Sequence, residues 1–266
     1  MADRWSLTDL ESAVHWCRIR AGQNIRCTLT VLAEYAQAPE ESDMAVTTQL
    51  KAIRKIGTGT AGTSFAVKPS SVGILFDSSE YKRNLSVIAR EAKARGVPLE
   101  IDMEGLPFVK DTLMSVLSLA GEGMPVTLAL QVYLDRTPGD LDTCRRSGIT
   151  VRLVKGAYLG DSEDFVDIQE RFRRNGETLI SAGIPFSAAT HDPELIEWLK
   201  ERVSDNRDLV EFSFLKGLAD KTKIELASDG WKVGEYVPYG PGGQSYVQRR
   251  ERYLKILGGL RRAPVP

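Results

Sequence analysis

Eight short apolar runs, separated by segments with helical periodicity, constrain the fold of this 266-residue chain more than any other feature. Each run has the length of a strand, and the segments between them repeat apolar residues at the spacing of a helix with one buried face. Strands that alternate with helices in this way form parallel sheets. The eight runs are 26–32, 64–70, 98–104, 126–133, 150–158, 185–191, 210–217 and 235–240.

The number of runs and their spacing favour a closed barrel. Eight strand–helix units in about 250 residues are what a (β/α)8 barrel needs. A doubly wound sheet is the second choice, but GTGTAG (57–62) precedes a strand, whereas a dinucleotide-binding turn follows one. LTDLESAVHWCRIR, before residue 26, predicts one additional helix that closes the barrel floor. We therefore expect an N-terminal helical extension over residues 1–25 and a barrel domain over residues 26–266.

Two of the segments between the runs carry recognisable helix ends. YKRNLSVIAREAKARG (81–96) finishes at Gly96, and Pro98 follows two residues later, which is a common helix stop. In DPELIEWLKERV (192–203), Asp192 suits the N-cap and Pro193 suits the first helical position. We therefore predict one helix that ends near Gly96 and another that begins at Pro193.

Charge and hydropathy exclude several classes of protein. A net charge of −1 offers no attraction to nucleic acid or to an anionic membrane. No apolar run approaches the ~20 residues of a membrane-spanning helix. MADRWSLTDLE has no signal-peptide core and is too acidic for a transit peptide. We expect a cytoplasmic protein with no nucleic-acid partner.

Histidine and cysteine are too scarce for most metal chemistry. Cys17, Cys27 and Cys144 are scattered, which fits free thiols in a reducing compartment and does not fit a zinc site. His15 and His191 are the two histidines of the chain, so a site with several histidine ligands is excluded. We predict no bound metal. The chemistry must then come from Lys, Arg, Tyr, carboxylates or an organic cofactor.

Polar side chains recur at the C-terminal ends of the predicted strands, where a (β/α)8 barrel carries its active site. Strand ends are often polar because they meet solvent, but Lys68, Asp102 and Arg152 lie within otherwise apolar runs. Buried charges need partners, so a ring of charges at one mouth either neutralises itself or binds a charged ligand. The side chains at these ends are Glu34, Lys68, Asp102, Glu104, Gln131, Tyr133, Arg152, Lys155, Tyr158, Thr190, His191, Lys216, Tyr236 and Tyr239.

QSYVQRRERYLK (244–255) predicts a last helix directly after the eighth run. Arg249 and Arg250 point about 100° apart on such a helix, and a solvent-exposed basic face is the simpler interpretation. However, the short connection YVPYGPGG keeps the start of this helix near the barrel mouth. We therefore expect the helix over the mouth, where a guanidinium group suits a carboxylate ligand.

In combination, these residues resemble the proline dehydrogenase family, both the monofunctional enzymes and the matching domain of the bifunctional proline utilization A proteins. The resemblance extends over about residues 26–255, and the blocks follow one another in the family's order. RLVKGAY together with ATH and a final RR is a specific combination. The matching blocks are TLTVLAE, AVKPSSVG, IDME, LQVYLDR, VRLVKGAY, ATHD, EFSFLKG, YVPYG and YVQRR.

The resemblance implies a (β/α)8 barrel that binds FAD across its strand ends and oxidises L-proline to Δ1-pyrroline-5-carboxylate. A hydride would pass from proline to the flavin, and a quinone would reoxidise the flavin. The charge of Arg152 would stabilise the reduced flavin, and small residues after the fifth run would let the backbone approach it closely. The implied cofactor residues are Asp102, Met103, Gln131, Arg152, Val154, Lys155, Gly156, Ala157, Thr190, His191 and Ser213.

For the substrate, the resemblance implies a carboxylate clamp made of three cations, which would orient proline for hydride loss. Tyr236 favours proline, because family members that prefer hydroxyproline tend to have a smaller residue at this position. Glu34 would pair with Arg250 as a lid that closes on binding. The implied catalytic residues are Lys68, Arg249 and Arg250, and the implied substrate contacts also include Asp102, Tyr158, Leu215 and Tyr236.

Four positions depart from the family pattern. Ala33 stands where the family has glycine before the lid glutamate, and Leu159 stands where an aromatic residue often follows GAY. Ser213 replaces a glutamine, and Tyr253 replaces a glutamate. Two alternatives therefore stay open: the same chemistry on hydroxyproline, thiazolidine carboxylate or another cyclic or N-alkyl amino acid, and a flavin-free barrel that binds an amino acid. A peripheral contact with the inner membrane, where the quinone resides, also stays open.

Overall fold

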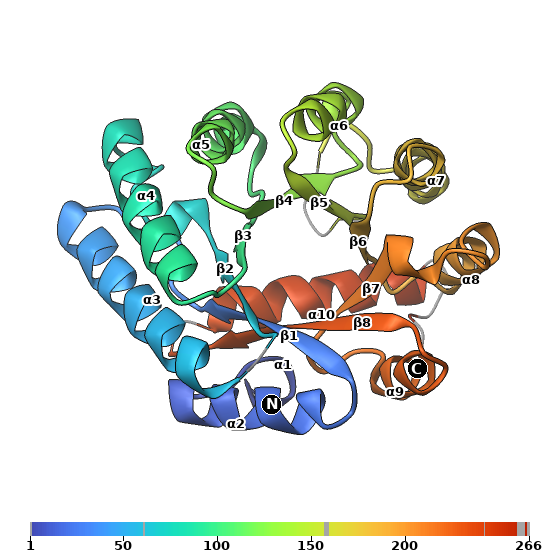
Figure 1. Ribbon diagram of the computed structural model, residues 1–266, viewed down its shortest axis with the longest axis horizontal. Helices are drawn as coiled ribbons and strands as arrows, with labels where there is room; N and C mark the ends of the chain where they lie inside the picture. Colours follow the sequence, from blue (N-terminus) through green and yellow to red (C-terminus); the bar gives the residue numbers. More distant parts are fainter. Residues whose placement is uncertain (1, 61, 157–159, 242, 260–263, 265–266) are drawn as a thin grey trace.

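Eight parallel strands close into a barrel in the order of the sequence, and β8 pairs with β1 along the full length of β1 (Figure 1). The predicted (β/α)8 barrel is therefore confirmed. The computed structural model describes residues 2–60, 62–156, 160–241, 243–259 and 264. The strands are β1 (Ile25–Val31), β2 (Ser64–Val67), β3 (Leu99–Ile101), β4 (Val126–Gln131), β5 (Thr150–Val154), β6 (Phe186–Ala189), β7 (Val210–Leu215) and β8 (Lys232–Tyr239).

Helices follow the strands and cover the outside of the barrel (Figure 1). Both predicted helix ends are confirmed. One helix ends at Ala94, shortly before Gly96 with its φ of +64°, and Asp192 caps another by accepting a hydrogen bond from the Glu194 backbone N–H at 3.0 Å. In the described ranges, no helix is both long and apolar enough to cross a membrane. The helices are α1 (Ala2–Trp5), α2 (Leu10–Ala21), α3 (Pro39–Gly59), α4 (Ser78–Ala94), α5 (Val109–Gly121), α6 (Thr137–Arg146), α7 (Phe165–Ser181), α8 (Pro193–Arg202), α9 (Asp220–Ser228) and α10 (Gln244–Gly259), with short 3-10 helices at Pro69–Ser71, Leu106–Phe108 and Arg207–Leu209.

Successive side chains of each strand alternate between the outer helices and the barrel axis. On β5, Leu153 is fully buried and lies against Gly176 of α7, whereas Arg152 and Val154 line a cavity at the mouth of the barrel. The main apolar core therefore lies between the sheet and the outer helices. The side chains that face the barrel axis near the mouth, such as Arg152, form the site.

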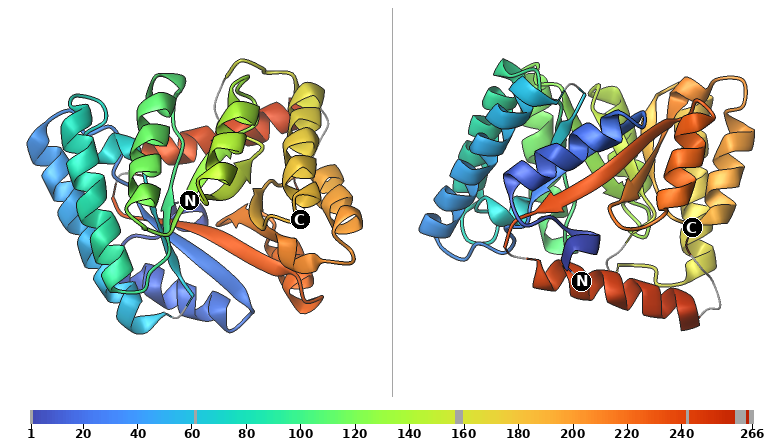
Figure 2. Two further views of the ribbon diagram at one scale, coloured as in Figure 1. Left: turned by 45° about the horizontal axis from the view of Figure 1, so that its top comes forward. Right: turned by 90° about the horizontal axis from the view of Figure 1, so that it is seen from below.

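Two helices depart from the regular plan of alternating strands and helices (Figure 2). α10, which follows β8, crosses over the C-terminal ends of the strands, as expected, and does not pack on the outside of the barrel. α2 takes the outer position between β8 and β1 and packs against both strands (Figure 1). The expectation that this N-terminal helix closes the barrel floor is therefore wrong. Its buried residue Cys17 lies against Cys27 on the outer face of β1, because the diversion of α10 leaves that face to be covered.

The interior of the barrel is ionic, whereas branched apolar side chains fill most barrels of this kind. Arg26, near the start of β1, pairs with Glu211 of β7 at 2.6 Å and with Glu100 of β3 at 3.3 Å. Glu100 pairs in turn with Arg152 of β5 at 2.7 Å, and Arg152 pairs with Asp102 at the end of β3. A chain of ion pairs thus runs from the floor to the mouth.

Candidate active site

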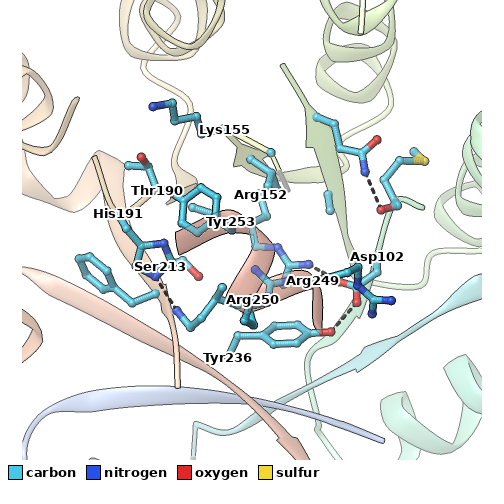
Figure 3. Close-up of a pocket in the computed structure, with 18 of the residues that line it drawn as sticks. Asp102, Arg152, Lys155, Thr190, His191, Ser213, Tyr236, Arg249, Arg250 and Tyr253 are labelled. Atoms are coloured by element: carbon cyan, nitrogen blue, oxygen red, sulfur yellow. Dashed lines mark hydrogen bonds and ion pairs between the residues drawn. The ribbon is translucent and has the colours of Figure 1, made fainter. Parts of the chain in front are cut away.

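A cavity lies at the mouth of the barrel, between the C-terminal ends of the strands and α10 (Figure 3). Most of the side chains predicted for the site line this cavity, although they are far apart in the sequence. The predicted residues that line it are Lys68, Asp102, Met103, Gln131, Arg152, Val154, Lys155, Gly156, Thr190, His191, Ser213, Leu215, Tyr236, Arg249 and Arg250, and they are joined by Ala129, Ala189, Phe214, Tyr246 and Tyr253. Ala157 and Tyr158 lie outside the described residues, as does Leu159.

Asp102 joins the charges at the centre of the site. Its carboxylate accepts hydrogen bonds from Lys68 Nζ at 3.0 Å, from Arg152 and from the Tyr236 hydroxyl. Burial favours a raised pKa for Asp102, but the charges of Lys68 and Arg152 outweigh it and hold the pKa at about 2. Asp102 is therefore ionised near neutral pH, and it fixes the tyrosine ring against the two cations.

Glu34 lies behind the cavity wall, in the segment that follows β1. Both of its oxygens accept hydrogen bonds from Arg249 Nη2, at 2.6 and 2.7 Å, and Lys68 Nζ is 3.7 Å away. The expected pair of Glu34 with Arg250 is therefore corrected to a pair with Arg249. Adjacent residues of a helix point about 100° apart, so Arg250 turns elsewhere and lies over the Tyr246 ring, 4.8 Å from its centroid.

His191 is buried and neutral. Its Nε2 accepts a hydrogen bond from the Leu215 backbone N–H at 3.0 Å, so the proton of the neutral ring lies on Nδ1. Burial, together with the nearby cations Lys223 and Arg250, lowers the pKa of His191 to about 3. At neutral pH, His191 can therefore donate one hydrogen bond from Nδ1 and carries no charge.

Lys155 is held at the edge of the cavity by groups from two outer helices. Its Nζ pairs with Asp192 Oδ2 at 2.6 Å and lies 3.4 Å from the centroid of the Phe165 ring. Gln169 of α7 donates a hydrogen bond to the same carboxylate oxygen at 2.7 Å. Since Asp192 also caps α8, the position of this lysine depends on how both helices pack.

Comparison with known protein sequences identifies the family. The family model for proline dehydrogenase matches residues 14–171. The chain belongs to the proline dehydrogenase family. Proline dehydrogenase 1 of Bacillus subtilis subsp. natto is 28% identical over 248 residues, which cover 91% of this chain and 82% of the relative. The proline dehydrogenase of Deinococcus radiodurans is 29% identical over 253 residues, again 91% of this chain and 82% of the relative.

Solved structures share the fold of this proline dehydrogenase family member. Proline utilization A from Bdellovibrio bacteriovorus, inactivated by N-propargylglycine, matches with a TM-score of 0.84 and 17% identity over 94% of this chain. Proline utilization A from Bradyrhizobium japonicum matches with a TM-score of 0.80 and 21% identity. This chain spans about a third of the length of these two proteins, with 32% and 30% covered.

The cavity walls fit a flavin, the cofactor that proline dehydrogenases generally bind. Gln131 donates from Nε2 to the Met103 carbonyl at 2.8 Å, while its buried Oε1 has no partner among the described residues and can accept from a ring N–H. Gly156 has a φ of +119°, which suits glycine, and it leaves the end of β5 without a side chain. An acceptor on Gln131, the Nδ1–H donor of His191 and the Arg152 cation thus line the same cavity as the Gly156 backbone.

Several residues of the site do not stand out as functional in the sequence motifs of the proline dehydrogenase family. Glu100, which holds Arg152, lies two positions before Asp102, and strand alternation alone points both side chains inward. Tyr246 lies one helical turn before Arg250 and supports its guanidinium group. Asp192 is recognisable as a helix cap, but its ion pair with Lys155 depends on the tertiary structure.

Proposed function

We propose that this chain oxidises L-proline to Δ1-pyrroline-5-carboxylate, with FAD as the hydride acceptor and a quinone as the final electron acceptor. The observation that carries the proposal is the convergence of Lys68 with Arg249 and Arg250 on one cavity at the barrel mouth. These cations come from the end of β2 and from α10, and they meet in a member of the proline dehydrogenase family.

Binding of the substrate carboxylate by this cluster would orient the ring. Hydrogen bonds between charged groups are roughly twice as strong as neutral ones, and orientation supplies a large part of the rate of such reactions. Leu215 and Tyr236 offer apolar surface for the ring in the same cavity. Hydride loss from a carbon next to a neutral amine needs little acid–base chemistry from the protein. This agrees with a site whose histidine is neutral and whose Asp102 is already bound by Lys68, Arg152 and Tyr236.

FAD, when bound, would supply the ring nitrogen that accepts the hydride. The Gln131 Oε1 would accept a hydrogen bond from the ring edge, His191 Nδ1 would donate one, and Arg152 would favour negative charge on the reduced ring. The small side chains of Ala129, Ala189 and Ser213 line the same cavity, which supports a cofactor at this wall. The residues proposed to hold FAD are Asp102, Met103, Gln131, Arg152, Val154, Lys155, Gly156, Ala157, Thr190, His191 and Ser213.

Glu34 is proposed as the lid of the site, with Arg249 as its partner. A substrate carboxylate would compete with Glu34 for Arg249, because both anions need the same guanidinium group. Entry of the substrate would therefore be coupled to movement of the segment between β1 and α3. Tyr158 is also proposed to help close the pocket.

Proline is the preferred substrate in this proposal for a specific reason. The Tyr236 hydroxyl is bound to Asp102, so the ring is fixed in the cavity and would oppose a hydroxyl group on the substrate. A barrel that binds amino acids without flavin is less well supported, since Gln131 Oε1 would then stay buried without a hydrogen bond. The quinone and a peripheral contact at the inner membrane rest on the family resemblance, and the proposed cytoplasmic location rests on the scattered cysteines of the sequence.

A turnover assay tests the proposal. Protein loaded with FAD and supplied with L-proline and a water-soluble quinone should reduce the quinone and release a product that o-aminobenzaldehyde traps. Hydroxyproline and thiazolidine carboxylate should react about tenfold more slowly or worse, which corresponds to ~1.4 kcal/mol or more in the barrier. A faster reaction with either analogue would transfer the assignment to that amino acid. Absence of quinone reduction with all three would refute the proposal.

A further inference from the structure

Glu100 lies beneath the cavity, in the interior of the barrel, and does not line the cavity itself. Its side chain is 5% exposed, yet four groups from three other strands converge on it. Oε1 lies 2.6 Å from Ser64 Oγ, 2.9 Å from Thr28 Oγ1 and 3.3 Å from Arg26 Nη1, and Oε2 accepts a hydrogen bond from Arg152 Nη1 at 2.7 Å. So many contacts fix this carboxylate in one position.

Glu100 carries a negative charge near neutral pH. Burial favours a raised pKa for Glu100, but Arg152 and Arg26, with the hydroxyls of Ser64 and Thr28, outweigh it and keep the pKa below its usual value. The negative charge of Glu100 therefore partly neutralises the positive charge of Arg152 from the floor side of the barrel.

Arg152 pairs with two carboxylates, Glu100 and Asp102, which differ in their other contacts. Its Nη2 donates to Asp102, which also accepts from Lys68 and Tyr236. Its Nη1 donates to Oε2 of Glu100, and Ser64, Thr28 and Arg26 contact the other oxygen, Oε1. Asp102 likewise gives Oδ1 to Arg152 and Oδ2 to Lys68 and Tyr236. The two carboxylates thus hold Arg152 from opposite sides, Asp102 at the mouth and Glu100 below the cavity, where Arg26 and the two hydroxyls keep Glu100 in place.

We propose that Glu100 is a positioning residue that fixes the guanidinium group of Arg152 and thereby sets the reduction potential of the bound flavin. The inference rests on the proposed function, since it takes Arg152 to act on FAD. A partly neutralised Arg152 favours the reduced, negatively charged flavin less than an unopposed one. Loss of the Glu100 charge should therefore raise the potential.

The variants E100Q and E211Q form a matched pair. Each replaces one glutamate of the ion chain by the amide of nearly the same shape, but Glu211 is partly buried and contacts Arg26 and not Arg152. In E100Q, reduced FAD should bind at least tenfold more tightly relative to oxidised FAD than in the wild type, which is a rise of about 30 mV for a two-electron couple. In E211Q, the affinity for reduced FAD relative to oxidised FAD should change less than about twofold. Equal shifts in the two variants, or an unchanged potential in E100Q, would overturn the inference.

A second readout does not need flavin. Nitrogen-15 NMR of arginine-labelled protein, with the signal assigned by R152K, measures how freely the guanidinium group rotates. The two Nη resonances of Arg152 should be separate in the wild type and in E211Q and should merge in E100Q. If E100Q does not fold, E100D keeps the charge with a side chain one methylene shorter and should merge the signals in the same way. Separate Nη signals of Arg152 in whichever of E100Q and E100D folds would contradict the positioning role of Glu100. A wild-type protein that takes up no FAD would contradict the proposed function alone.

Discussion

At the scale of single residues, the site is a set of buried charges that neutralise one another in pairs. Arg152 lies between Glu100 and Asp102, and Lys68 lies between Asp102 and Glu34. A buried ion costs several kcal/mol unless it is paired, so each cation needs its carboxylate for the fold to be stable. A carboxylate ligand can therefore enter with little further cost if it replaces one that is already present, and Glu34 on Arg249 is the one that lies in the segment between β1 and α3.

A double-mutant cycle tests which arginine Glu34 contacts. Glu34→Ala combined with R249A should show a coupling of about 1–3 kcal/mol in the free energy of unfolding, because the two side chains touch. Glu34→Ala combined with R250A should be additive to within about 0.5 kcal/mol. Urea denaturation of the single and double variants measures both values. A coupling with Arg250 as large as that with Arg249 would contradict the corrected pair.

The neutral state of His191 predicts how stability depends on pH. Its pKa is about 3 in the folded protein and about 6.5 in an unfolded chain. Between these values the unfolded chain binds a proton that the folded protein does not, so the free energy of unfolding falls as the pH falls below about 6.5. Protonation of His191 in the unfolded chain lowers the free energy of unfolding by up to ~1.4 kcal/mol per pH unit in this range.

The variant H191N should lose this part of the pH dependence. Urea denaturation at pH 5, 6, 7 and 8 measures it, and H15N is the control because His15 is exposed. The slope below about pH 6.5 should be shallower in H191N than in the wild type and unchanged in H15N. The same slope in all three proteins would show that His191 is charged in the folded state or titrates normally.

At the scale of elements, one buried carboxylate joins the N-terminal helix to the barrel. Glu235 of β8 accepts a hydrogen bond from Trp16 of α2 at 2.6 Å and pairs with Arg20 of α2 at 2.8 Å. It also pairs with Lys223 of α9, and the side chains of both residues are fully buried. α2 therefore holds its place in the outer ring through charges as well as through apolar contacts.

Removing one partner of this cluster should be costly. K223M leaves Glu235 with one fewer cation in a buried position, and we expect the free energy of unfolding to fall by about 3–5 kcal/mol. R202A is the control, since Arg202 pairs with Glu177 at the surface, and it should cost less than about 1 kcal/mol. Guanidinium denaturation compares the two. A loss of under 1 kcal/mol in K223M would mean that α2 and α9 do not depend on the cluster.

At the scale of the whole molecule, the fold follows from the sequence because strand and helix periodicity report local geometry. The runs that predict β1 to β8 all form strands, and Asp192 with Pro193 marks the true start of α8. The position of α2 does not follow, because it depends on a gap that α10 leaves in the outer ring. A pattern of apolar residues shows that a helix has one buried face, and it does not show which surface that face covers.

The side chains of the cavity could be predicted as a set, but their pairing could not. The ends of parallel strands in a barrel meet at one rim, so Lys68 and Arg152 had to lie near each other. Which carboxylate faces which cation depends on rotamers and on the rotation of α10. Glu34 therefore pairs with Arg249 where Arg250 is expected, and Glu100 becomes visible only when the inward faces of β3 and β5 are seen together.

An anaerobic titration of FAD-loaded protein with L-proline tests the central claim most directly, because it asks whether substrate and flavin meet at the barrel mouth. The account predicts that proline bleaches the flavin absorption band. It also predicts that K68M, which lacks one cation of the clamp, needs about 10- to 150-fold more proline, as expected for a lost charged hydrogen bond of about 1.5–3 kcal/mol. A flavin band that proline leaves unchanged in the wild type would contradict the account.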